Sequence, residues 1–259
     1  MNLINLIKSP LMHLYNKFYN SLFKIGLQYT LREDLKTFFY RALSYQNYVA
    51  KQEYGFPPTT YYEFGVGWGG SLTKFISALK MFCKLSKTDI YSYHIFGFDS
   101  FEGLPEKKSY KDDHRGWKKG QFSKNLSEIK KIVHNLGIDL KRNTVNFIKG
   151  YYENVLTPTL REELKEFPPT IINIDVDFYS STKIVLEWLR PMLISGILFY
   201  FDDIWGFDGH PDHGQLAAIR EFNDAGEGKL TPYPLLGLAS KVYIYSGKEF
   251  EYQETKQFK

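Results

Sequence analysis

Two short apolar runs, each followed by a pair of acidic residues, flank a segment with helical periodicity. The runs cover residues 171–174 and 197–201, and the acids are Asp175 and Asp177 after the first and Asp202 and Asp203 after the second. Continuous apolar runs of this length are typical of buried parallel strands. Between them, apolar residues recur at helical spacing from Ile184 to Met192, and Thr182 is a candidate cap for that helix. The pattern predicts a strand-helix-strand unit.

The same alternation extends over most of the chain. Further strands are predicted at residues 60–66, 94–99, 145–149 and 241–245, and further helices at 32–51, 72–82, 126–136, 160–167 and 215–225. Strands that alternate with helices favour an α/β fold, in which helices cover both faces of a mostly parallel sheet. Pro57 and Pro58 break the pattern just before the first of these strands. We therefore expect a Rossmann-like domain over residues 60–259 and an N-terminal helical extension over residues 1–59.

The first 32 residues of the extension are basic and amphipathic. They contain four Lys or Arg residues and no acid, and apolar residues recur at helical spacing from Leu11 to Ile25. Such a helix can serve as a lid on its own domain, as an arm that joins two copies in a homo-oligomer, or as a helix that lies on an anionic membrane surface. The first two alternatives are favoured over membrane-surface contact.

Composition narrows the partners and the compartment. The 259 residues carry a formal net charge of +4, with basic residues dispersed among acids from Glu33 onward, and this does not indicate a nucleic-acid partner. The single cysteine, Cys83, excludes an internal disulfide and lies among apolar residues, as a small core side chain would. No apolar run is long enough for a transmembrane helix and no cleavable signal is evident, so we expect a cytoplasmic protein.

The acids that follow the two central strands are candidates for a metal site. Both carboxyl ends of a strand-helix-strand unit lie at one edge of the sheet, where open α/β folds bind ligands. Asp175 and Asp177 project to the same side of an extended chain and repel one another unless a cation lies between them. A hard divalent cation bound through oxygen, such as Mg²⁺, removes that cost. Alternatively, Asp175 and Asp203 cap neighbouring helices and the other acids are solvated.

A glycine-rich segment follows the strand predicted at residues 60–66. Its residues include Gly65, Gly67, Gly69, Gly70 and Ser71, and a helix is predicted to begin directly after them. Glycines allow the backbone to approach a ligand at a helix N-terminus, although the G-x-G-x-x-G pattern alone is a weak signal. Glu63 would repel a pyrophosphate and suits a cationic or amino-acid-bearing cofactor. Asp99, at the end of the strand at 94–99, is placed to accept hydrogen bonds from two ribose hydroxyls.

Two polar segments are candidates for the acceptor side of a site. Residues 107–119 are long for a loop inside a domain, which favours an active-site lid over a solvated excursion. Residues 206–214 contain His210 and His213 beside Asp212, and these histidines are either acceptor-site groups or ordinary polar turn residues.

Four blocks of sequence, in this order, resemble the motifs of the macrocin O-methyltransferase (TylF) family. They are Glu63-Phe-Gly-Val-x-x-Gly-Gly-Ser71, Gly97-Phe-Asp-Ser-Phe-Glu-Gly-Leu-Pro105, Ile174-Asp-Val-Asp-x-Tyr-x-Ser-Thr182 and residues 196–203. The resemblance spans roughly residues 61–222. It implies a class I S-adenosylmethionine-dependent methyltransferase fold, with a seven-stranded sheet whose last strand is antiparallel. It also implies magnesium-dependent O-methylation of a sugar or polyketide hydroxyl.

The resemblance assigns roles to individual residues. The implied cofactor-binding residues are Glu63, Gly65, Gly67, Gly69, Ser71, Asp99 and Ser100, with Glu63 and the glycines on the methionine part and Asp99 on the ribose. Asp175, Asp202 and Asp203 match the magnesium ligands. The segments 107–119 and 206–214 match no motif of the family, so the small-molecule or glycan acceptor is not identified by the resemblance.

Methyl transfer needs an oxygen nucleophile in line with the sulfonium and a group that accepts the hydroxyl proton. Bound Mg²⁺ lowers the pKa of a hydroxyl that it contacts, and Asp177 or His213 is the candidate base. A vicinal diol on a sugar suits this chemistry, and a catechol would satisfy the same geometry.

Three other functions compete with methyl transfer. Asp175-Val-Asp177 is a D-x-D motif, which in a glycosyltransferase holds a metal-bound nucleotide sugar, but this leaves the glycines unexplained. A nicotinamide-dependent dehydrogenase leaves the acids unexplained. The third alternative, a non-catalytic Rossmann-like binding protein, is disfavoured by the intact set of acids.

Overall fold

The computed structural model describes residues 35–50, 59–142, 144–233 and 241–247. The strands are β1 (Thr60–Phe64), β2 (His94–Asp99), β3 (Val145–Lys149), β4 (Ile171–Ile174), β5 (Leu198–Phe201), β6 (Gly228–Pro232) and β7 (Val242–Gly247). The α-helices are α2 (Leu35–Ser44), α4 (Gly70–Ser86), α5 (Leu126–Asn135), α6 (Tyr152–Val155), α7 (Pro158–Glu163), α8 (Tyr179–Leu189) and α9 (Gly214–Asp224). Shorter helical turns are η1 (Tyr45–Ala50), η2 (Ile90–Ser92), η3 (Tyr110–Asp112), η4 (Leu140–Arg142) and η5 (Arg190–Met192). The helix predicted within residues 1–32 lies outside the described residues, so its three proposed roles stay predictions.

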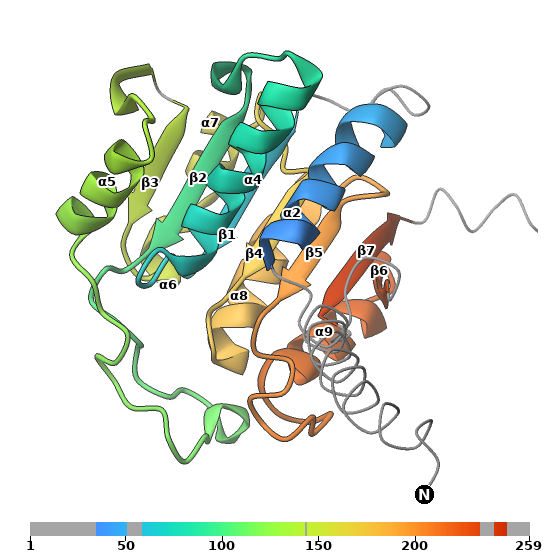
Figure 1. The fold of residues 1–259 in the computed structure, drawn as a ribbon. Coiled ribbons are helices and arrows are strands. Elements are labelled where there is room, and N and C mark those ends of the chain that lie inside the picture. The colour runs from blue at the N-terminus through green and yellow to red at the C-terminus, as the bar shows by residue number, and fades with distance from the viewer. Residues whose placement is uncertain (1–34, 51–58, 143, 234–240, 248–259) are drawn as a thin grey trace, which may run out of the picture. The chain divides into compact units, whose positions relative to one another are not determined.

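Seven strands form one sheet in the order β3-β2-β1-β4-β5-β7-β6 (Figure 1). Strands β1 to β5 are parallel to their neighbours among themselves, whereas β7 runs antiparallel to both β5 and β6. This confirms the predicted α/β class with seven strands, the last of them antiparallel. The sequence pattern gave no individual prediction for β6, because Gly228–Pro232 lacks the apolar alternation that marks a strand.

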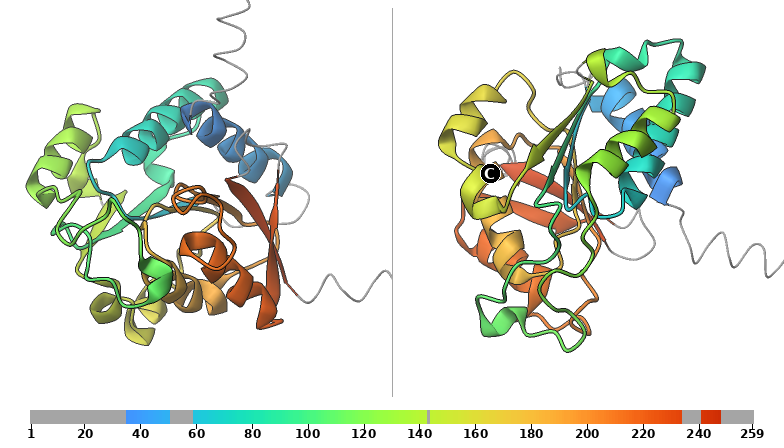
Figure 2. Two further views of the ribbon diagram at one scale, coloured as in Figure 1. Left: turned by 90° about the horizontal axis from the view of Figure 1, so that it is seen from below. Right: turned by 90° about the vertical axis from the view of Figure 1, so that its left-hand side faces the viewer.

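Alternation along the strands divides the core between the two faces of the sheet. Tyr61 and Ile171 pack among residues of α2, α4 and α5, whereas their neighbours Tyr62 and Ile172 pack among residues of α8 and α9. Successive side chains of a strand point to opposite faces, so strands covered on both sides are mostly apolar. Buried Glu63 in β1 and Asn173 in β4 are polar exceptions. Figure 2 shows the sheet between these two layers of helices.

Helix α2 contributes to the core on the α4 side. Phe38 and Phe39 are buried, and the Phe39 ring meets the rings of Tyr61 and Phe75 edge-on at centroid distances of 5.5 and 5.3 Å. The sequence placed these residues in the N-terminal extension. The apolar face of α2 packs over α4, and the compact unit that contains the sheet begins at Leu35. The role predicted for the N-terminal extension stays a prediction.

The start of α8 differs from the sequence-based prediction. Its N-cap is Phe178, and Thr182 lies within the first turn, where its hydroxyl donates a hydrogen bond to the Phe178 carbonyl at 2.8 Å. The prediction that Thr182 caps the helix was therefore wrong. Asp177 has a positive φ of 59°, so the chain turns sooner after β4 than the apolar spacing indicated.

Two features of the described residues bear on the expectations from composition. Cys83 is a free, buried side chain of α4. No helix in the described ranges is long and apolar enough to cross a membrane. The expected cytoplasmic location stays a prediction.

Candidate active site

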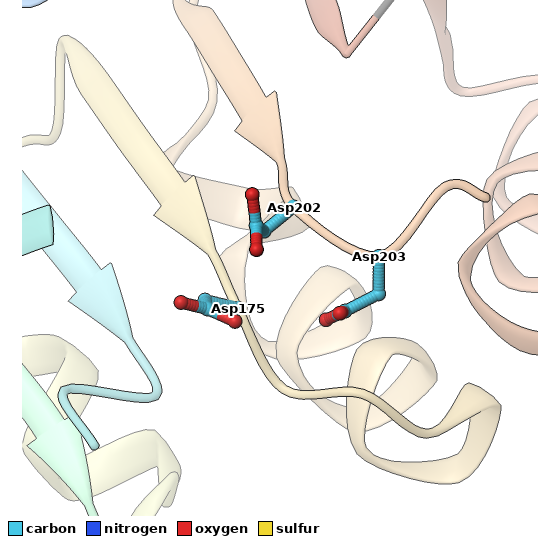
Figure 3. Close-up of side chains that lie close together, drawn as sticks. All are labelled: Asp175, Asp202 and Asp203. Atoms are coloured by element: carbon cyan, nitrogen blue, oxygen red, sulfur yellow. The ribbon is translucent and has the colours of Figure 1, made fainter. Parts of the chain in front are cut away.

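Three carboxylates meet at the carboxyl edge of the sheet. Asp175 follows β4, and Asp202 and Asp203 follow β5 (Figure 3). Each residue offers a carboxylate oxygen that lies within 4.8 Å of those of the other two. The register pairs Ile174 with Phe201, so the two strands end level with one another. The strand-helix-strand unit thus brings these acids together, as its sequence pattern predicted.

A chain of hydrogen bonds fixes the acidic loop. The Asp203 amide donates to Oε1 of Gln215 at 2.9 Å, and Nε2 of Gln215 donates to the Ile174 carbonyl at 3.1 Å. The Asp177 amide in turn donates to Oδ2 of Asp203 at 2.9 Å. Gln215, in the first turn of α9, therefore ties the loop after β5 to the end of β4.

These contacts argue against the helix-capping alternative. The N-cap of α8 is Phe178 and that of α9 is His213, and neither N-cap side chain makes a capping hydrogen bond. The Ser180 amide in the first turn of α8 donates to Asp112, not to an acid of the cluster. Asp203 accepts instead from Asp177, which precedes α8. The carboxylates converge on each other rather than on helix ends.

Burial and mutual repulsion disfavour the charged forms of the acids. Burial, followed by the charges of Asp203 and Asp202, raises the pKa of Asp175 well above its ordinary value. The same causes raise the pKa of Asp177 to about 8. Burial and the charge of Asp202 raise the pKa of Asp203 to about 7. Within the part of the chain that is described, the ion pair of the cluster is the one between Lys241 Nζ and Oδ1 of Asp202, 3.0 Å apart.

The turn after β1 passes directly over the end of β4. A Cβ atom at Gly65, where φ is +85°, would lie 1.7 Å from the Asp175 carbonyl oxygen. Only glycine fits this close approach. Beyond it, the Gly67 amide donates to Oδ2 of Asp99 at 2.8 Å, and the Phe101 amide donates to Oδ1 at 2.6 Å. The glycine turn and the end of β2 are thereby joined.

The buried Glu63 side chain is hydrogen-bonded to Ser71, which follows the glycine turn. The Glu63 side chain is fully buried, with Oε2 accepting a hydrogen bond from the Tyr61 hydroxyl at 2.9 Å and Oε1 accepting one from the Ser71 hydroxyl. Burial raises the pKa of Glu63 to about 8, although the bonds from Ser71 and Tyr61 act to lower it. Glu63 is thereby linked to Ser71, which lies in the first turn of α4 directly after the glycine turn.

One cavity of about 470 Å³ contains both the glycine turn and the acidic cluster. The predicted site residues that line it are Gly65, Gly67, Ser71, Asp99, Ser100, Asp175, Asp177, Asp202 and Asp203. Glu63 and Gly69 are not among its lining residues; Glu63 is buried beneath the turn, and Gly69 is the N-cap of α4 with φ 77°. Ligand cavities are typically of this size.

His213 is also not among the lining residues of the cavity. Its Nδ1 lies 3.1 Å from Nδ1 of His210, and its ring meets those of Tyr110 and Phe207 at 5.9 and 6.0 Å. The Asp212 amide donates to His210 at 3.2 Å, and the Asp212 carboxylate pairs with Arg220. These contacts fit polar turn residues that order the loop better than groups that touch a substrate.

Several residues at the site were not predicted. Gly150, Tyr151, Tyr152 and Glu153 line the cavity directly after β3. Their position after a parallel strand was a usable signal, because all such strand ends share one edge of the sheet. Gln215 and Lys241 carry no comparable signal, since each reaches the acids from an element distant in sequence.

A sheet in this order, with a glycine turn after β1, an acid at the end of β2 and an acidic cluster after β4 and β5, defines a class I methyltransferase domain. The family comparison is more specific: the family model of macrocin-O-methyltransferase (TylF) matches residues 49–225. The chain therefore belongs to the macrocin O-methyltransferase (TylF) family, a family of O-methyltransferases.

Solved structures share the fold. The calicheamicin methyltransferase CalS11 is 22% identical, with a TM-score of 0.61 over 83% of this chain and 79% of that one. An apo structure of CalS11, described as a TDP-rhamnose 3'-O-methyltransferase, is 21% identical with a TM-score of 0.55 over the same shares, 83% and 79%. The O-methyltransferase NovP is 18% identical, with a TM-score of 0.56 over 82% of this chain and 79% of that one. No curated protein matches the chain in sequence.

Proposed function

We propose that this protein is an S-adenosylmethionine-dependent, Mg²⁺-assisted O-methyltransferase that acts on a hydroxyl of a sugar in a small natural product. The observation that carries the proposal is the single cavity in which the glycine turn of the family and three converging carboxylates lie together. A methyl donor and an acceptor hydroxyl can meet only if their sites share one such space.

The residues of the turn fit the methyl donor. Gly65 leaves no room for a side chain, so the cavity there is bounded by backbone. Each oxygen of the Asp99 carboxylate accepts one backbone N–H, which fixes its orientation and leaves lone pairs for ribose hydroxyls. S-adenosylmethionine would supply an electrophilic methyl group on a sulfonium.

The acidic cluster fits a hard divalent cation. Asp175, Asp202 and Asp203 offer only carboxylate oxygens, which Mg²⁺ prefers. Burial, followed by the charges of neighbouring carboxylates, raises the pKa of Asp175 and of Asp203, and a divalent cation would relieve that repulsion. Bound Mg²⁺ would lower the pKa of an acceptor hydroxyl and hold the acceptor in place.

Asp177 is the proposed proton acceptor. It lines the cavity beside the acidic cluster, and its burial raises its pKa above that of an ordinary aspartate, which favours proton uptake. The hydrogen bond from its own amide to Asp203 holds its backbone beside the cluster. His213 is the less suitable candidate because it does not line the cavity.

The test is to incubate the protein with S-adenosylmethionine, Mg²⁺ and a set of sugar acceptors and to detect products by mass spectrometry. TDP-rhamnose is a suitable first acceptor because CalS11 is described as acting on it. The expected product is heavier by one methyl group in place of a hydrogen. Calorimetry with S-adenosylhomocysteine, UDP-sugars and NAD addresses the rival functions, and tight binding of a UDP-sugar or NAD alone would contradict the proposal.

A further inference from the structure

Residues 107–119 form an ordered structure beside the site. The segment contains the short helix η3 and lies alongside the loop at residues 206–214 (Figures 1 and 2). The rings of His114 and Phe207 meet edge-on at 5.3 Å between these two segments. The sequence had left open whether the segment is a lid or a solvated excursion.

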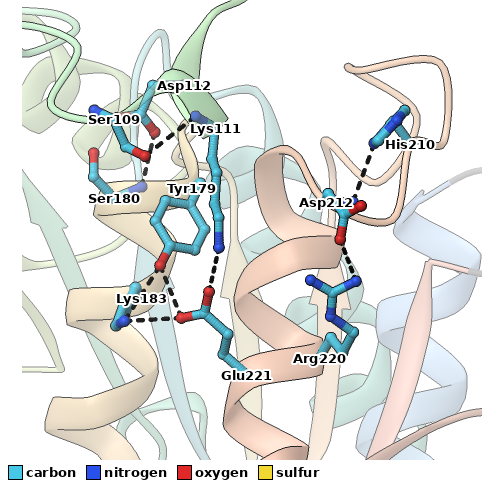
Figure 4. A network of polar contacts seen from close by, with 10 residues as sticks. All are labelled: Ser109, Lys111, Asp112, Tyr179, Ser180, Lys183, His210, Asp212, Arg220 and Glu221. Carbon is cyan, nitrogen blue, oxygen red and sulfur yellow. Dashed lines mark hydrogen bonds and ion pairs between the residues drawn. The ribbon is translucent and has the colours of Figure 1, made fainter.

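A single buried carboxylate fastens the segment to α8. The Asp112 side chain is fully buried; its Oδ2 accepts from the amides of Lys108 and Ser109 at 3.0 and 3.1 Å. Its Oδ1 accepts from the amide of Ser180 at 2.9 Å (Figure 4). Ser180 lies in the first turn of α8, and its neighbour Ser181 lines the cavity. The donor in each of these three hydrogen bonds is a backbone N–H group.

A second anchor ties the same segment to α9. The Glu221 carboxylate accepts hydrogen bonds from Lys111, from Lys183 at 2.8 Å and from the Tyr179 hydroxyl at 2.8 Å (Figure 4). The Lys111 side chain is only 15% exposed, so this ion pair is shielded more than an ordinary surface pair. Lys111 and Asp112 thus attach adjacent positions of the segment to two different helices.

The anchored segment presents Trp117 to the cavity. The indole lines the cavity, stacks on His114 at a centroid distance of 4.0 Å, and meets Phe207 and Phe178 at 5.5 and 6.0 Å. A Cβ at Gly206 would lie 2.6 Å from Cη2 of Trp117, so the ring has little freedom on that side. Phe178 follows Asp177, and the position of Gly206 also adjoins the Asp203 carbonyl, so the indole lies beside the acidic cluster.

We propose that Trp117 forms a wall of the acceptor site, where its indole packs against the sugar ring, and that Asp112 is the positioning residue that holds it there. The inference rests on the proposed function, because it assumes a sugar acceptor. An indole combines a broad apolar face with an N–H at its edge, which suits a ring with an apolar face and a rim of hydroxyls. Polar groups that orient such a ligand lie nearby in Asp175 and Asp177.

The anchoring is tested by Asp112→Asn, with Asp113→Asn as the matched control. Both carboxylate oxygens of Asp112 accept from backbone N–H groups, so in either orientation of an asparagine amide its NH₂ group faces an N–H donor and hydrogen bonds are lost. The control residue, Asp113, is 78% exposed and pairs only with Lys107 within the described structure. The segment contains six Lys or Arg residues, so trypsin reports its opening. Asp112→Asn should speed cleavage within 107–119 about tenfold, and Asp113→Asn should leave it within about twofold. Equal cleavage rates in the two variants would overturn the role of Asp112.

The wall is tested by steady-state kinetics with TDP-rhamnose and p-nitrophenyl rhamnoside as acceptors. Trp117→Ala should raise the KM for the acceptor about tenfold while the KM for S-adenosylmethionine stays within about twofold, and Trp117→Phe should restore most of the loss. Asp112→Asn should shift the acceptor KM in the same direction. An unchanged acceptor KM in Trp117→Ala, or equal changes in both KM values, would overturn the role of Trp117 but leave the proposed function intact.

Failure of the proposed function gives a different result. If the wild-type protein methylates neither rhamnose compound nor any acceptor of the sugar set, the sugar class is wrong and the inference falls with it. Calorimetry with S-adenosylhomocysteine on the wild type then separates a wrong acceptor, where binding persists, from a wrong cofactor, where no binding is measured.

Discussion

Replacing Glu63 with glutamine should make the stability of the protein depend less on pH. Glu63 is fully buried, and burial raises its pKa from the ordinary 4.5 to about 8. Between these pH values the folded protein holds a proton that the unfolded chain has released. The free energy of unfolding therefore falls as pH rises, by about 1.4 kcal/mol per pH unit. The contribution of Glu63 is fully present below pH 4.5 and is lost as the pH approaches 8, about 5 kcal/mol in all.

The glutamine variant keeps the packing and removes the titration. Its amide oxygen can accept from one of the two hydroxyls of Tyr61 and Ser71, and its NH₂ group can donate to the other, because a hydroxyl both donates and accepts. Urea unfolding of both proteins in EDTA at pH 5, 6.5 and 8 measures the difference. The variant should gain on the wild type by roughly 3 to 4 kcal/mol between pH 5 and pH 8. A difference that stays constant over this range would refute the buried, proton-holding carboxyl.

Three further predictions concern the glycine turn, Asp99 and the N-terminal segment. Gly65→Ala should destabilise the protein by more than about 2 kcal/mol in urea unfolding, because of its φ of +85° and the contact with Asp175, whereas Gly70→Ala, with open space around it, should stay within about 0.5 kcal/mol. Asp99→Ala should weaken S-adenosylmethionine binding by about 1.5 to 3 kcal/mol while the protein remains folded. Unchanged affinity in calorimetry would show that Asp99 does not bind the ribose hydroxyls. Deletion of residues 1–32 should leave cofactor binding intact but alter association state or acceptor turnover, and a truncated protein unchanged in both would leave liposome binding as the next experiment.

The sequence predicted most of the sheet because its central strands are buried on both faces. The mostly apolar segments 94–99, 145–149 and 171–174 were predicted as strands, and they coincide with β2, β3 and β4. Parallel strands also share a carboxyl edge, so the meeting of Asp175, Asp202 and Asp203 could be foreseen from their positions alone. Local pattern and chain topology are sufficient for these features.

The remaining features depend on contacts between distant parts of the chain. Gln215 reaches back to Ile174 across 41 positions, and Lys241 reaches Asp202 across 39, which no local pattern encodes. The burial of Asp112 was likewise not predictable, because its polar surroundings in sequence resemble a solvated loop. His213 was a reasonable candidate base from its residue type, yet it does not line the cavity, and its Nδ1 lies 3.1 Å from Nδ1 of His210.

The central claim is that methyl transfer requires a divalent cation held by Asp175, Asp202 and Asp203. The most direct measurement is methyl transfer by protein stripped with EDTA and then supplied with Mg²⁺, in the wild type, in Asp202→Asn and in the exposed control Asp224→Asn. Activity should be lost in EDTA and restored by Mg²⁺ in the wild type and the control. Asp202→Asn removes one charged ligand, so it should need more Mg²⁺ and turn over more slowly while S-adenosylhomocysteine affinity stays within about twofold. Full activity of the wild type in EDTA would contradict the account.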